Sequence, residues 1–285
     1  MAQSTPRVWL ITGSSTGFGR AMVEEVLRNG EIAVATLRKP SVLDDLAAKY
    51  PRTQLLVLPL DVTNEAQVKS AFALAKDAFG RVDVVYNNAA QAFFQEVEGT
   101  SLDRARKLMD INFWGAVMGA GGMLVQVSSM AGTTAVPLIG FYSTTKAALD
   151  SFTDVLAQEV LPAWNIRFVN VHPGWTRTPI VEFPSSEMPE PPAPYASEPT
   201  AVTMKIRAGF DAFTISDALA DVEVVTKRIW SVTQMDDEYL RKGVQESIPG
   251  LVNVHTGMDS LERVHAKIGR LQGELMWNTK VHYEY

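Results

Sequence analysis

The chain alternates short apolar segments with longer segments whose apolar residues recur at helical spacing, and this alternation restricts the fold more than any other feature. Short continuous apolar runs are typical of buried strands, whereas recurrence every three or four residues is typical of helices. Strands separated by helices form βαβ units, in which the strands run parallel. We therefore predict an α/β fold built on a doubly wound parallel sheet. The expected strands are 8–11, 32–37, 55–60, 82–86, 123–127 and 166–171, and the expected helices are 19–29, 42–49, 65–79, 101–118, 142–160, 200–213 and 222–232.

The alternation of strand-like and helix-like segments stops in the stretch from Phe183 to Pro199, which contains six prolines. No helix or strand is expected across such a density of proline. The segment follows the sixth expected strand, at the edge where ligands bind in such sheets, so we interpret it as a loop over a substrate; a disordered linker is the alternative. We expect a single domain over 1–285, with a cofactor and catalytic core in 1–180 and the substrate loop and C-terminal helices in 181–285. The pattern after Asp236 is mixed and predicts no particular element.

Composition limits the class of protein. Hydrophobic residues make up 46% of the 285 residues and charged residues 20%, which is an ordinary globular profile. The formal net charge of −6 argues against a general nucleic-acid or anionic-membrane binder. The chain has no cysteine, and its histidines lack metal-ligand spacing, so we expect no metal site. No apolar run reaches the ~18 residues of a membrane span, and the N-terminus has no signal-peptide pattern, so we expect a cytoplasmic protein.

A glycine-rich turn, Thr12-Gly13-Ser-Ser-Thr-Gly17-Phe-Gly19, lies between the first expected strand and the first expected helix. Glycine allows the backbone to turn tightly and to approach a pyrophosphate without a Cβ clash. The helix that follows offers unpaired N–H groups to an anion. This placement favours a dinucleotide-binding turn over a purely structural one. The candidate cofactor contacts in the turn are Gly13, Ser15, Gly17, Phe18 and Gly19.

The end of the second expected strand indicates which dinucleotide would bind. Sites for NAD usually place an acidic residue there for the ribose hydroxyls. Here the stretch Ala35-Thr-Leu-Arg38-Lys39 has two cations and no carboxylate. Arg38 can bind a 2′-phosphate bidentately, and Lys39 adds positive charge. A solvated surface pair is the alternative, but the missing acid and the two bases together predict NADP(H) over NAD(H).

A tyrosine and a lysine stand four residues apart in an expected helix, so Tyr142 and Lys146 share one face. A free phenol has a pKa of about 10, and a nearby ammonium favours the phenolate, which fits a tyrosine for acid–base chemistry. Ser129 follows the fifth expected strand, where its hydroxyl can hold a reacting oxygen beside Tyr142. A surface pair is the alternative for Tyr142 and Lys146 alone; in a dinucleotide-binding chain the catalytic interpretation is favoured.

Taken together, these motifs resemble those of the short-chain dehydrogenase/reductase family, in the group of hydroxysteroid dehydrogenases and carbonyl reductases. The resemblance implies a single-domain Rossmann-type doubly wound parallel sheet with a C-terminal helical substrate-binding region. It also implies an NADP-preferring ketoreductase type of oxidoreductase. The matches run in the family order over about 1–180 and comprise Thr12-Gly13-x-x-x-Gly17-x-Gly19, Asp61-Val62, Asn87-Asn88-Ala89-Ala90, Asn112, Ser129, Tyr142-x-x-x-Lys146 and Pro173-Gly174-x-x-x-Thr178.

The resemblance also implies a role for each matching residue. Tyr142 would be the acid/base and Ser129 would position the substrate oxygen. Lys146 would bind the nicotinamide ribose and lower the pKa of the tyrosine, and Asn112 would hold a water in a proton relay with Lys146. The implied cofactor contacts beyond the glycine-rich turn are Arg38, Lys39, Asp61 at the adenine, Val62, Asn88 at the ribose, Ala89, Tyr142, Lys146, Pro173, Gly174 and Thr178 at the carboxamide.

The chain departs from the family between Asn112 and Ser129, where members have roughly ten more residues, or about three helical turns. The helix is trimmed there, or residues are missing from the sequence. Since glycine is unfavourable in helices, we expect the helix from Ser101 to end near Met118, and Gly119–Gly122 to be extended and the most mobile part of the nucleotide-binding half. In the family this helix belongs to the subunit interface, so we expect a homo-oligomer weakened by the shortening. Ala90, where the family has glycine, is a smaller departure.

The most consistent function is an NADP(H)-dependent oxidoreductase that interconverts a carbonyl and a secondary alcohol. Its expected partner is a small apolar carbonyl or alcohol substrate, and Phe93, Phe94 and Trp175 line the substrate pocket or pack the loops. His172 precedes Pro-Gly and is interpreted as a packing residue rather than a base. The alternative function is a non-catalytic NADP(H)-binding regulatory protein on the same fold.

Overall fold

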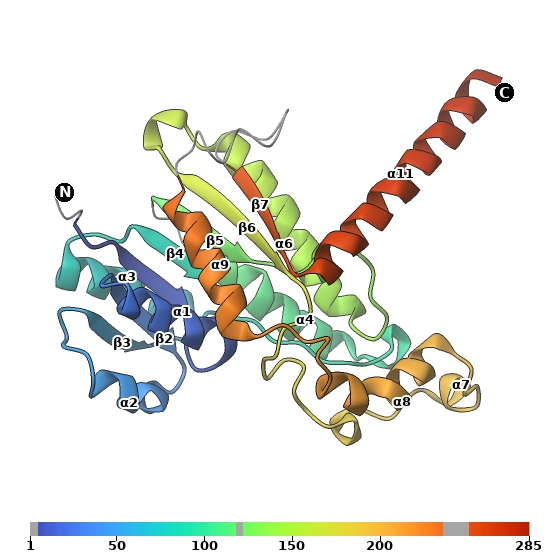
Figure 1. The fold of residues 1–285 in the computed structure, drawn as a ribbon, viewed down its shortest axis with the longest axis horizontal. Helices are drawn as coiled ribbons and strands as arrows, with labels where there is room; N and C mark the ends of the chain where they lie inside the picture. Colours follow the sequence, from blue (N-terminus) through green and yellow to red (C-terminus); the bar gives the residue numbers. More distant parts are fainter. Residues whose placement is uncertain (1–4, 118–121, 236–250, 285) are drawn as a thin grey trace.

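Seven parallel strands form one sheet in the order β3-β2-β1-β4-β5-β6-β7 in the computed structural model (Figure 1). The structure describes residues 5–117, 122–235 and 251–284. The strand order reverses direction between β1 and β4, which is the switch point where ligands bind in doubly wound sheets. The predicted α/β class and parallel sheet are therefore confirmed. The strands are β1 (Val8–Thr12), β2 (Ile32–Leu37), β3 (Leu55–Pro59), β4 (Val84–Asn87), β5 (Met123–Val127), β6 (Arg167–Pro173) and β7 (Leu251–Thr256).

Helices cover both faces of the sheet, so the strands are buried on both sides. Figure 1 shows α1 and α9 against one face, and these two helices also pack on each other. The helices α3, α4 and α6 cover the other face. The longer helices are α1 (Gly17–Arg28), α3 (Glu65–Phe79), α4 (Leu102–Asn112), α6 (Gly140–Glu159), α8 (Val202–Thr214), α9 (Val222–Gln234) and α11 (Met258–Glu284), and the short ones are η1 (Pro40–Leu43), α2 (Asp44–Ala47), η2 (Val97–Gly99), η3 (Trp114–Ala116), α5 (Met130–Thr133), η4 (Pro162–Trp164), η5 (Ser185–Glu187) and α7 (Ala193–Ala196).

The strand β1 shows why the apolar segments form this sheet. Trp9 and Ile11 belong to the core under α1 and α9, while Val8 and Leu10 belong to the core under α3. All four are at most 1% exposed. A side chain of this size contributes about 1.5–3 kcal/mol when it is fully buried, so each strand residue favours a position between two helical layers.

Local signals set the ends of several helices. The Asn64 side chain accepts a hydrogen bond from the Gln67 amide at the start of α3, and Gly80 ends that helix in the left-handed conformation. Ser101 caps α4 in the same way, and Asp221 caps α9. Such caps contribute about 1 kcal/mol each and explain why these starts were predictable from sequence.

The predicted helix over 101–118 is wrong at its C-terminal end, because α4 ends at Asn112 and a single 3₁₀ turn follows. A side chain from the sheet forms a hydrogen bond with the backbone after α4. The Asn87 side-chain amide donates to the Ala116 carbonyl at 2.7 Å. The backbone of Gly115 also lies close to Val62, where a Cβ would come within 2.7 Å of the Val62 side chain. The expected extended segment over 119–122 falls mostly outside the described residues.

The last part of the chain also differs from expectation. The mixed tail contains β7, which adds a parallel strand beside β6, and the long α11, which projects from the body (Figure 1). The proline-rich segment, expected without helix, contains the single turns η5 and α7. Pro194 lies in the first turn of α7, where its missing N–H breaks no hydrogen bond. In the described part of the chain, no helix combines the length and the apolar character needed to cross a bilayer.

Candidate active site

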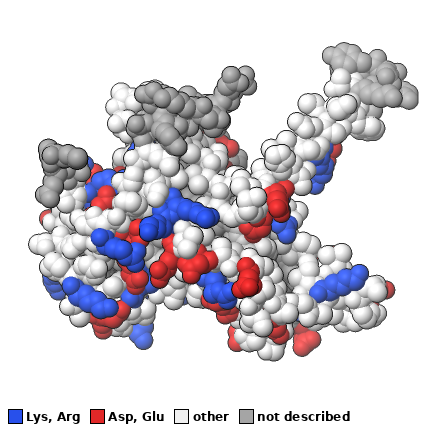
Figure 2. Space-filling model, in the orientation of Figure 1, with Lys and Arg blue, Asp and Glu red and all other residues white. Residues whose placement is uncertain are grey.

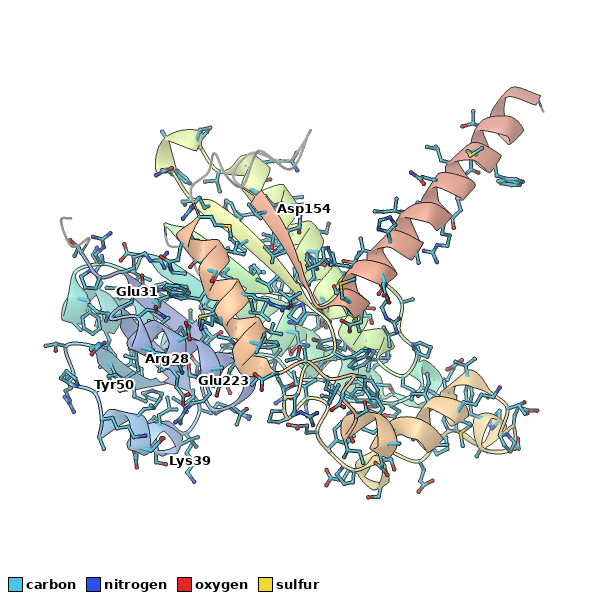
Figure 3. All side chains as sticks on the ribbon, viewed as in Figure 1. Arg28, Glu31, Lys39, Tyr50, Asp154 and Glu223 are labelled. Carbon is cyan, nitrogen blue, oxygen red and sulfur yellow. The ribbon has the colours of Figure 1, made fainter. Side chains whose placement is uncertain are left out.

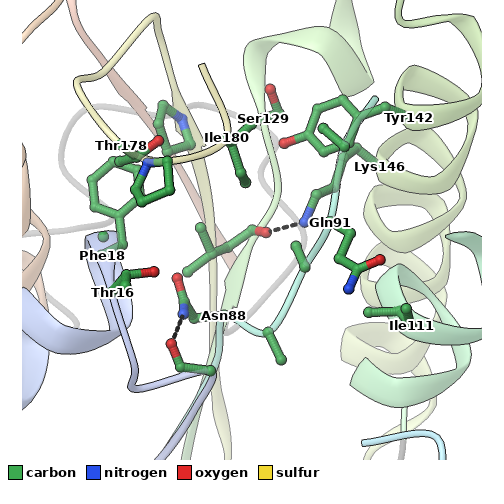
Figure 4. A pocket seen from close by; sticks show the side chains of 18 of the residues that line it. Thr16, Phe18, Asn88, Gln91, Ile111, Ser129, Tyr142, Lys146, Thr178 and Ile180 are labelled. Carbon is green, nitrogen blue, oxygen red and sulfur yellow. Dashed lines mark hydrogen bonds between the residues drawn. The ribbon is translucent and has the colours of Figure 1, made fainter. Parts of the chain in front are cut away.

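A cavity of about 560 Å³ opens at the carboxyl ends of the strands around the switch point (Figure 4). The side chains that line it come from the loops after β1, β2, β3, β4, β5 and β6 and from α4 and α6. Most of the predicted site residues meet here. Those that line the cavity are Gly13, Ser15, Gly17, Phe18, Arg38, Asp61, Val62, Asn88, Ala89, Ser129, Tyr142, Lys146, Pro173, Gly174 and Thr178.

The glycine-rich turn is held against the end of β4. Gly13 and Gly17 adopt positive φ angles of 68° and 55°, which other residues reach only with strain. A Cβ on Gly13 would lie 2.8 Å from the Ala89 Cα atom. The Asn88 side chain donates to the Thr12 carbonyl at 2.9 Å, and the Thr12 hydroxyl accepts from the Asn88 amide at 3.0 Å. The sequence therefore produces a bare backbone cradle that fits a pyrophosphate.

Gly19 supports this cradle from behind and does not line the cavity. A Cβ there would lie 2.2 Å from the Gly13 carbonyl oxygen, so only glycine allows α1 to start so close to the turn. Gly17 and Phe18 of the first turn of α1 line the cavity, and the first turn of a helix is where phosphate binds in dinucleotide sites.

Arg38 and Asp61 lie at the other end of the cradle. Arg38 is exposed at the end of β2, so its guanidinium is free to meet an incoming anion. Hydrogen bonds from the side chain and the backbone of Thr63 hold the pKa of Asp61 below its ordinary value, and the charge of Arg38 adds to this effect. Lys39 does not line the cavity; it lies at the outer edge of the molecule beside α2 (Figure 3). The cavity residues therefore fit a dinucleotide, with Arg38 as the cation near its ribose.

Ser129, Tyr142 and Lys146 meet on one wall of the cavity (Figure 4). Tyr142 and Lys146 share a face of α6, as their spacing predicts, and the Lys146 Nζ atom lies 5.7 Å from the centre of the Tyr142 ring. The Lys146 ammonium donates to the Val127 carbonyl at 2.7 Å. Ser129 follows β5 and its hydroxyl caps α5 by accepting from the Ala131 amide at 3.1 Å.

Burial dominates the electrostatics of this wall. It raises the pKa of Tyr142 to about 12, although a hydrogen bond with Ser129 acts in the opposite direction. Burial also lowers the pKa of Lys146 to about 8, against the charge of Asp150. Without a ligand, Tyr142 is therefore a neutral phenol that can give a proton to an oxygen placed between it and Ser129.

Asn112 does not line the cavity but fixes the loop that does. Its side-chain oxygen accepts from the Gln91 amide at 2.8 Å, and its nitrogen donates to the Gln91 carbonyl at 2.8 Å. The same nitrogen donates to the Thr145 hydroxyl at 3.1 Å. Asn112 thus joins α4, the loop after β4 and α6 one residue before Lys146.

Aromatic side chains close the cavity beyond Tyr142. Phe94 and Trp175 line it with ring centres 6.4 Å apart. Phe94 also contacts Phe210 of α8 with ring centres 5.0 Å apart. Phe93 points elsewhere and lies under the Arg104 guanidinium at 4.1 Å. Of the three candidates for an apolar pocket, Phe94 and Trp175 therefore reach the cavity.

Several lining residues carried no sequence signal that we used. Gln91 directly follows the motif Asn-Asn-Ala-Ala, and Ile180 lies two residues after the motif Pro-Gly-x-x-x-Thr, so their proximity to these motifs could have identified them. Lys107 and Asp110 line the cavity from α4, and no motif marks them.

Comparison with known proteins agrees with this geometry. The family model of the short chain dehydrogenases matches residues 7–188. An uncharacterized oxidoreductase of Schizosaccharomyces pombe is 35% identical over 198 residues, 65% of this chain and 65% of that protein, so the match spans just under two thirds of that relative. An NADP-dependent (R)-specific alcohol dehydrogenase of Lentilactobacillus kefiri is 28% identical over 63% of this chain and 82% of that protein. A crystal structure of a short-chain dehydrogenase from Streptomyces avermitilis superposes with a TM-score of 0.76 at 26% identity, covering 98% of each chain.

A family that uses nicotinamide cofactors thus shares both the sheet topology and the order of motifs found here. The residues that would bind such a cofactor form the cradle described above, and Tyr142 lies on the wall of the same cavity. The chain belongs to the short-chain dehydrogenase family.

Proposed function

We propose that this protein is an oxidoreductase that uses NADP(H) to interconvert a small apolar carbonyl compound and the corresponding secondary alcohol. The observation that carries the proposal is the position of Ser129, Tyr142 and Lys146 on one wall of a cavity that has the bare glycine turn and Arg38 at its other end. A purely regulatory dinucleotide binder would need the turn and Arg38 but not the three residues of the wall.

The chain's own residues account for the proton transfer. The hydroxyls of Ser129 and Tyr142 would hold the substrate oxygen, and in reduction Tyr142 would give it a proton. A nicotinamide cofactor, when bound, would supply the hydride that the carbonyl carbon accepts. In oxidation Tyr142 accepts the proton. The Lys146 ammonium, held by the Val127 carbonyl, stabilises the phenolate that forms in reduction.

The preference for NADP(H) rests on Arg38. It is exposed and lines the cavity at the end of β2, and the residues of β2 include no carboxylate that would bind the ribose hydroxyls of NAD. A guanidinium matches the geometry of a phosphate better than any other side chain. The similar alcohol dehydrogenase of Lentilactobacillus kefiri, named as NADP-dependent, supports the same assignment.

The substrate class rests on the far end of the cavity. Phe94, Trp175 and Ile180 line it there, and Phe94 packs on the aromatic cluster of α8. Such walls favour an apolar body, while Ser129 and Tyr142 supply the polar contacts for a single oxygen. Small apolar ketones and aldehydes fit this description better than sugars or acids do.

The test is a screen of ketones and aldehydes in which NADPH absorbance is followed with the wild type and with Tyr142→Phe. We expect the variant to bind NADPH normally and to lose turnover by about 10²–10⁴ fold, because the substrate oxygen loses its proton donor. A variant that retains most of the wild-type rate would show that another group supplies the proton. A wild type that binds NADPH but reduces no carbonyl compound would favour the regulatory alternative.

A further inference from the structure

A buried acid and a buried base lie directly behind the catalytic wall. Asp150 belongs to α6 and His172 to β6, and the Asp150 Oδ2 atom lies 3.7 Å from the His172 Nδ1 atom. Their side chains are 17% and 4% exposed. Neither residue lines the cavity, and the proposed chemistry does not use them.

Both ring nitrogens of His172 face oxygen atoms. The Nε2 atom lies 3.0 Å from the Asn253 side-chain oxygen of β7, and the Nδ1 atom lies 3.4 Å from the Ser129 carbonyl oxygen. A neutral imidazole donates from only one nitrogen and would turn the lone pair of the other toward an oxygen. Both nitrogens therefore face possible acceptors, whereas the Asp150 Oδ1 atom is buried and has no hydrogen-bond partner among the described residues.

A second histidine, His255, packs against His172 and carries no charge at neutral pH. The His255 ring stacks on His172 with ring centres 4.5 Å apart. Burial, followed by the charge of His172, lowers the pKa of His255 to about 4. The Ser260 hydroxyl donates to the His172 carbonyl at 3.0 Å and lies 3.0 Å from the His255 Nδ1 atom, which therefore donates to it. His255 is thus neutral at pH 7.

The Asp150 carboxylate faces charges on several elements. Lys146 and Asp154 flank it on α6, and His172 faces it from β6. Burial raises the pKa of Asp150 above its ordinary value, although His172, a hydrogen bond with Ser128 and the charge of Lys146 act in the opposite direction. Gly132 of α5 covers the carboxylate so closely that a Cβ there would lie 2.6 Å from Asp150 Oδ2.

The pair is connected to each member of the catalytic wall. Tyr142, Lys146 and Asp150 are spaced by four residues along α6 and so share one face. The charge of Asp150 raises the pKa of Tyr142 and also that of Lys146. The His172 Nδ1 atom lies 3.4 Å from the backbone carbonyl oxygen of Ser129.

We propose that Asp150 and His172 form a buried ion pair that positions Ser129 and sets the charge balance of Tyr142 and Lys146. Both are therefore positioning residues for the reaction. They act through the residues of the wall and do not line the cavity themselves. This inference extends the proposed function, because its kinetic consequences require the carbonyl chemistry described above. The ion pair itself exists with or without turnover.

The first measurement needs no activity. The chain has 4 histidines, so nitrogen-labelled imidazoles can be observed by NMR and His172 identified with His172→Gln. We expect His172 to be an imidazolium at pH 7 in the wild type and a neutral imidazole in Asp150→Asn. The control is Glu159→Gln, which removes the same charge from the exposed end of α6 and should leave His172 protonated. A neutral His172 in the wild type at pH 7 would overturn the proposal.

The second measurement is the pH profile of kcat for ketone reduction. Loss of the Asp150 charge lowers the pKa of Tyr142 and of Lys146, so the phenol and the ammonium lose their protons at lower pH. We expect the alkaline limb to move to lower pH in Asp150→Asn by about one unit, a tenfold loss of kcat on that limb, with KM little changed. His172→Gln should reduce kcat at every pH, because it releases the Ser129 carbonyl.

The outcomes of the two measurements separate the two proposals. If no carbonyl compound is reduced by the wild type, the proposed function fails while the NMR result still decides the ion pair. If the wild type is active and the pH profiles of Asp150→Asn and the wild type superimpose, the positioning role is wrong. An equal shift in Glu159→Gln would likewise contradict it, since a general charge effect would then explain the change.

The unfolding midpoints of Asp150→Asn and His172→Gln show whether a loss of kcat in either variant reflects a loss of fold.

Discussion

At the scale of single residues, Arg38 and Lys39 show how neighbouring cations acquire different roles. Both follow β2 and both are exposed, but only Arg38 lines the cavity. The alternation of side chains along an extended segment turns successive residues to opposite sides. The sequence predicted both as cofactor contacts, and the structure supports that geometry for Arg38 alone.

We expect Arg38→Asp to weaken NADP(H) binding by on the order of 1.5–3 kcal/mol, since one charged bidentate contact is lost. Lys39→Asp is the matched control, with the same change of charge one residue away, and should weaken binding much less. Titration calorimetry with NADP(H) and NAD(H) measures both effects. Wild-type binding of NAD(H) as tight as that of NADP(H) would contradict the cofactor assignment.

At the scale of elements, α8 is fastened to the loop before α4 by a buried ion pair. The Arg207 guanidinium donates two hydrogen bonds to the Glu96 carboxylate, at 2.9 Å and 2.6 Å, and a third to the Pro189 carbonyl at 2.9 Å. The two side chains are 11% and 1% exposed. This pair holds the aromatic residues of α8 against Phe94, and so it shapes the apolar end of the cavity.

Replacing Arg207 by methionine leaves the Glu96 carboxylate buried without its partner, which costs on the order of 3–5 kcal/mol. We expect a lower unfolding midpoint, faster proteolysis within 183–214 and a higher KM for apolar ketones. Tyr195→Phe removes an exposed hydrogen bond to Glu98 in the same region and should change none of these. Unchanged proteolysis in Arg207→Met would show that α8 is held by its apolar contacts.

The ion pair between Glu96 and Arg207 predicts that the attachment of α8 depends on pH. Burial alone would raise the pKa of Glu96, but the hydrogen bonds and charge of Arg207 hold it below its ordinary value. A carboxyl whose pKa is lowered by folding stabilises the fold above its unfolded pKa, and this stabilisation is lost as the pH falls through the folded pKa. The attachment of α8 should therefore persist at neutral pH and weaken only below about pH 4. Proteolysis of this segment by pepsin at stepped acidic pH, compared with Arg207→Met, measures the change.

At the scale of the whole molecule, α11 divides into an anchored base and an exposed arm. At the base, Asp259 accepts from the Trp175 amide at 2.7 Å and Ser260 donates to the His172 carbonyl. Beyond Lys267, which donates to the Thr133 carbonyl, every residue from Ile268 to Thr279 is exposed. Figure 2 shows lysines, arginines and acidic residues interspersed on the body from which the arm projects.

We expect truncation after Lys267, which removes residues 268–285, to change the unfolding free energy by less than about 1 kcal/mol, or under about 4 °C in the midpoint, because residues 268–279 of the removed segment are exposed. Truncation before Met258 is the contrasting control. It removes the hydrogen bonds of Asp259 and Ser260 and should lower both the midpoint and turnover. Calorimetric unfolding of the two truncated chains at several protein concentrations gives the comparison. A large, concentration-dependent loss on removal of the arm would mean that contacts between chains stabilise it.

The amino-acid sequence by itself determined the features that depend on near neighbours. The glycine turn, the spacing of Tyr142 and Lys146, the helix caps and the apolar strands are local, because conformational preference and side-chain direction act over a few residues. These motifs also contain most of the predicted site residues that line the cavity. The local pattern also indicated six of the strands.

Only the tertiary structure decided the features that depend on contacts between distant segments. The end of α4 depends on the hydrogen bond that the Asn87 side chain donates to the Ala116 carbonyl. The strand β7 depends on its parallel pairing with β6. Asp150 and His172 have no local signal of their own and meet because α6 packs across β6. Burial then removes their water and makes each depend on the other, so their role arises from packing and could not be read from spacing along the chain.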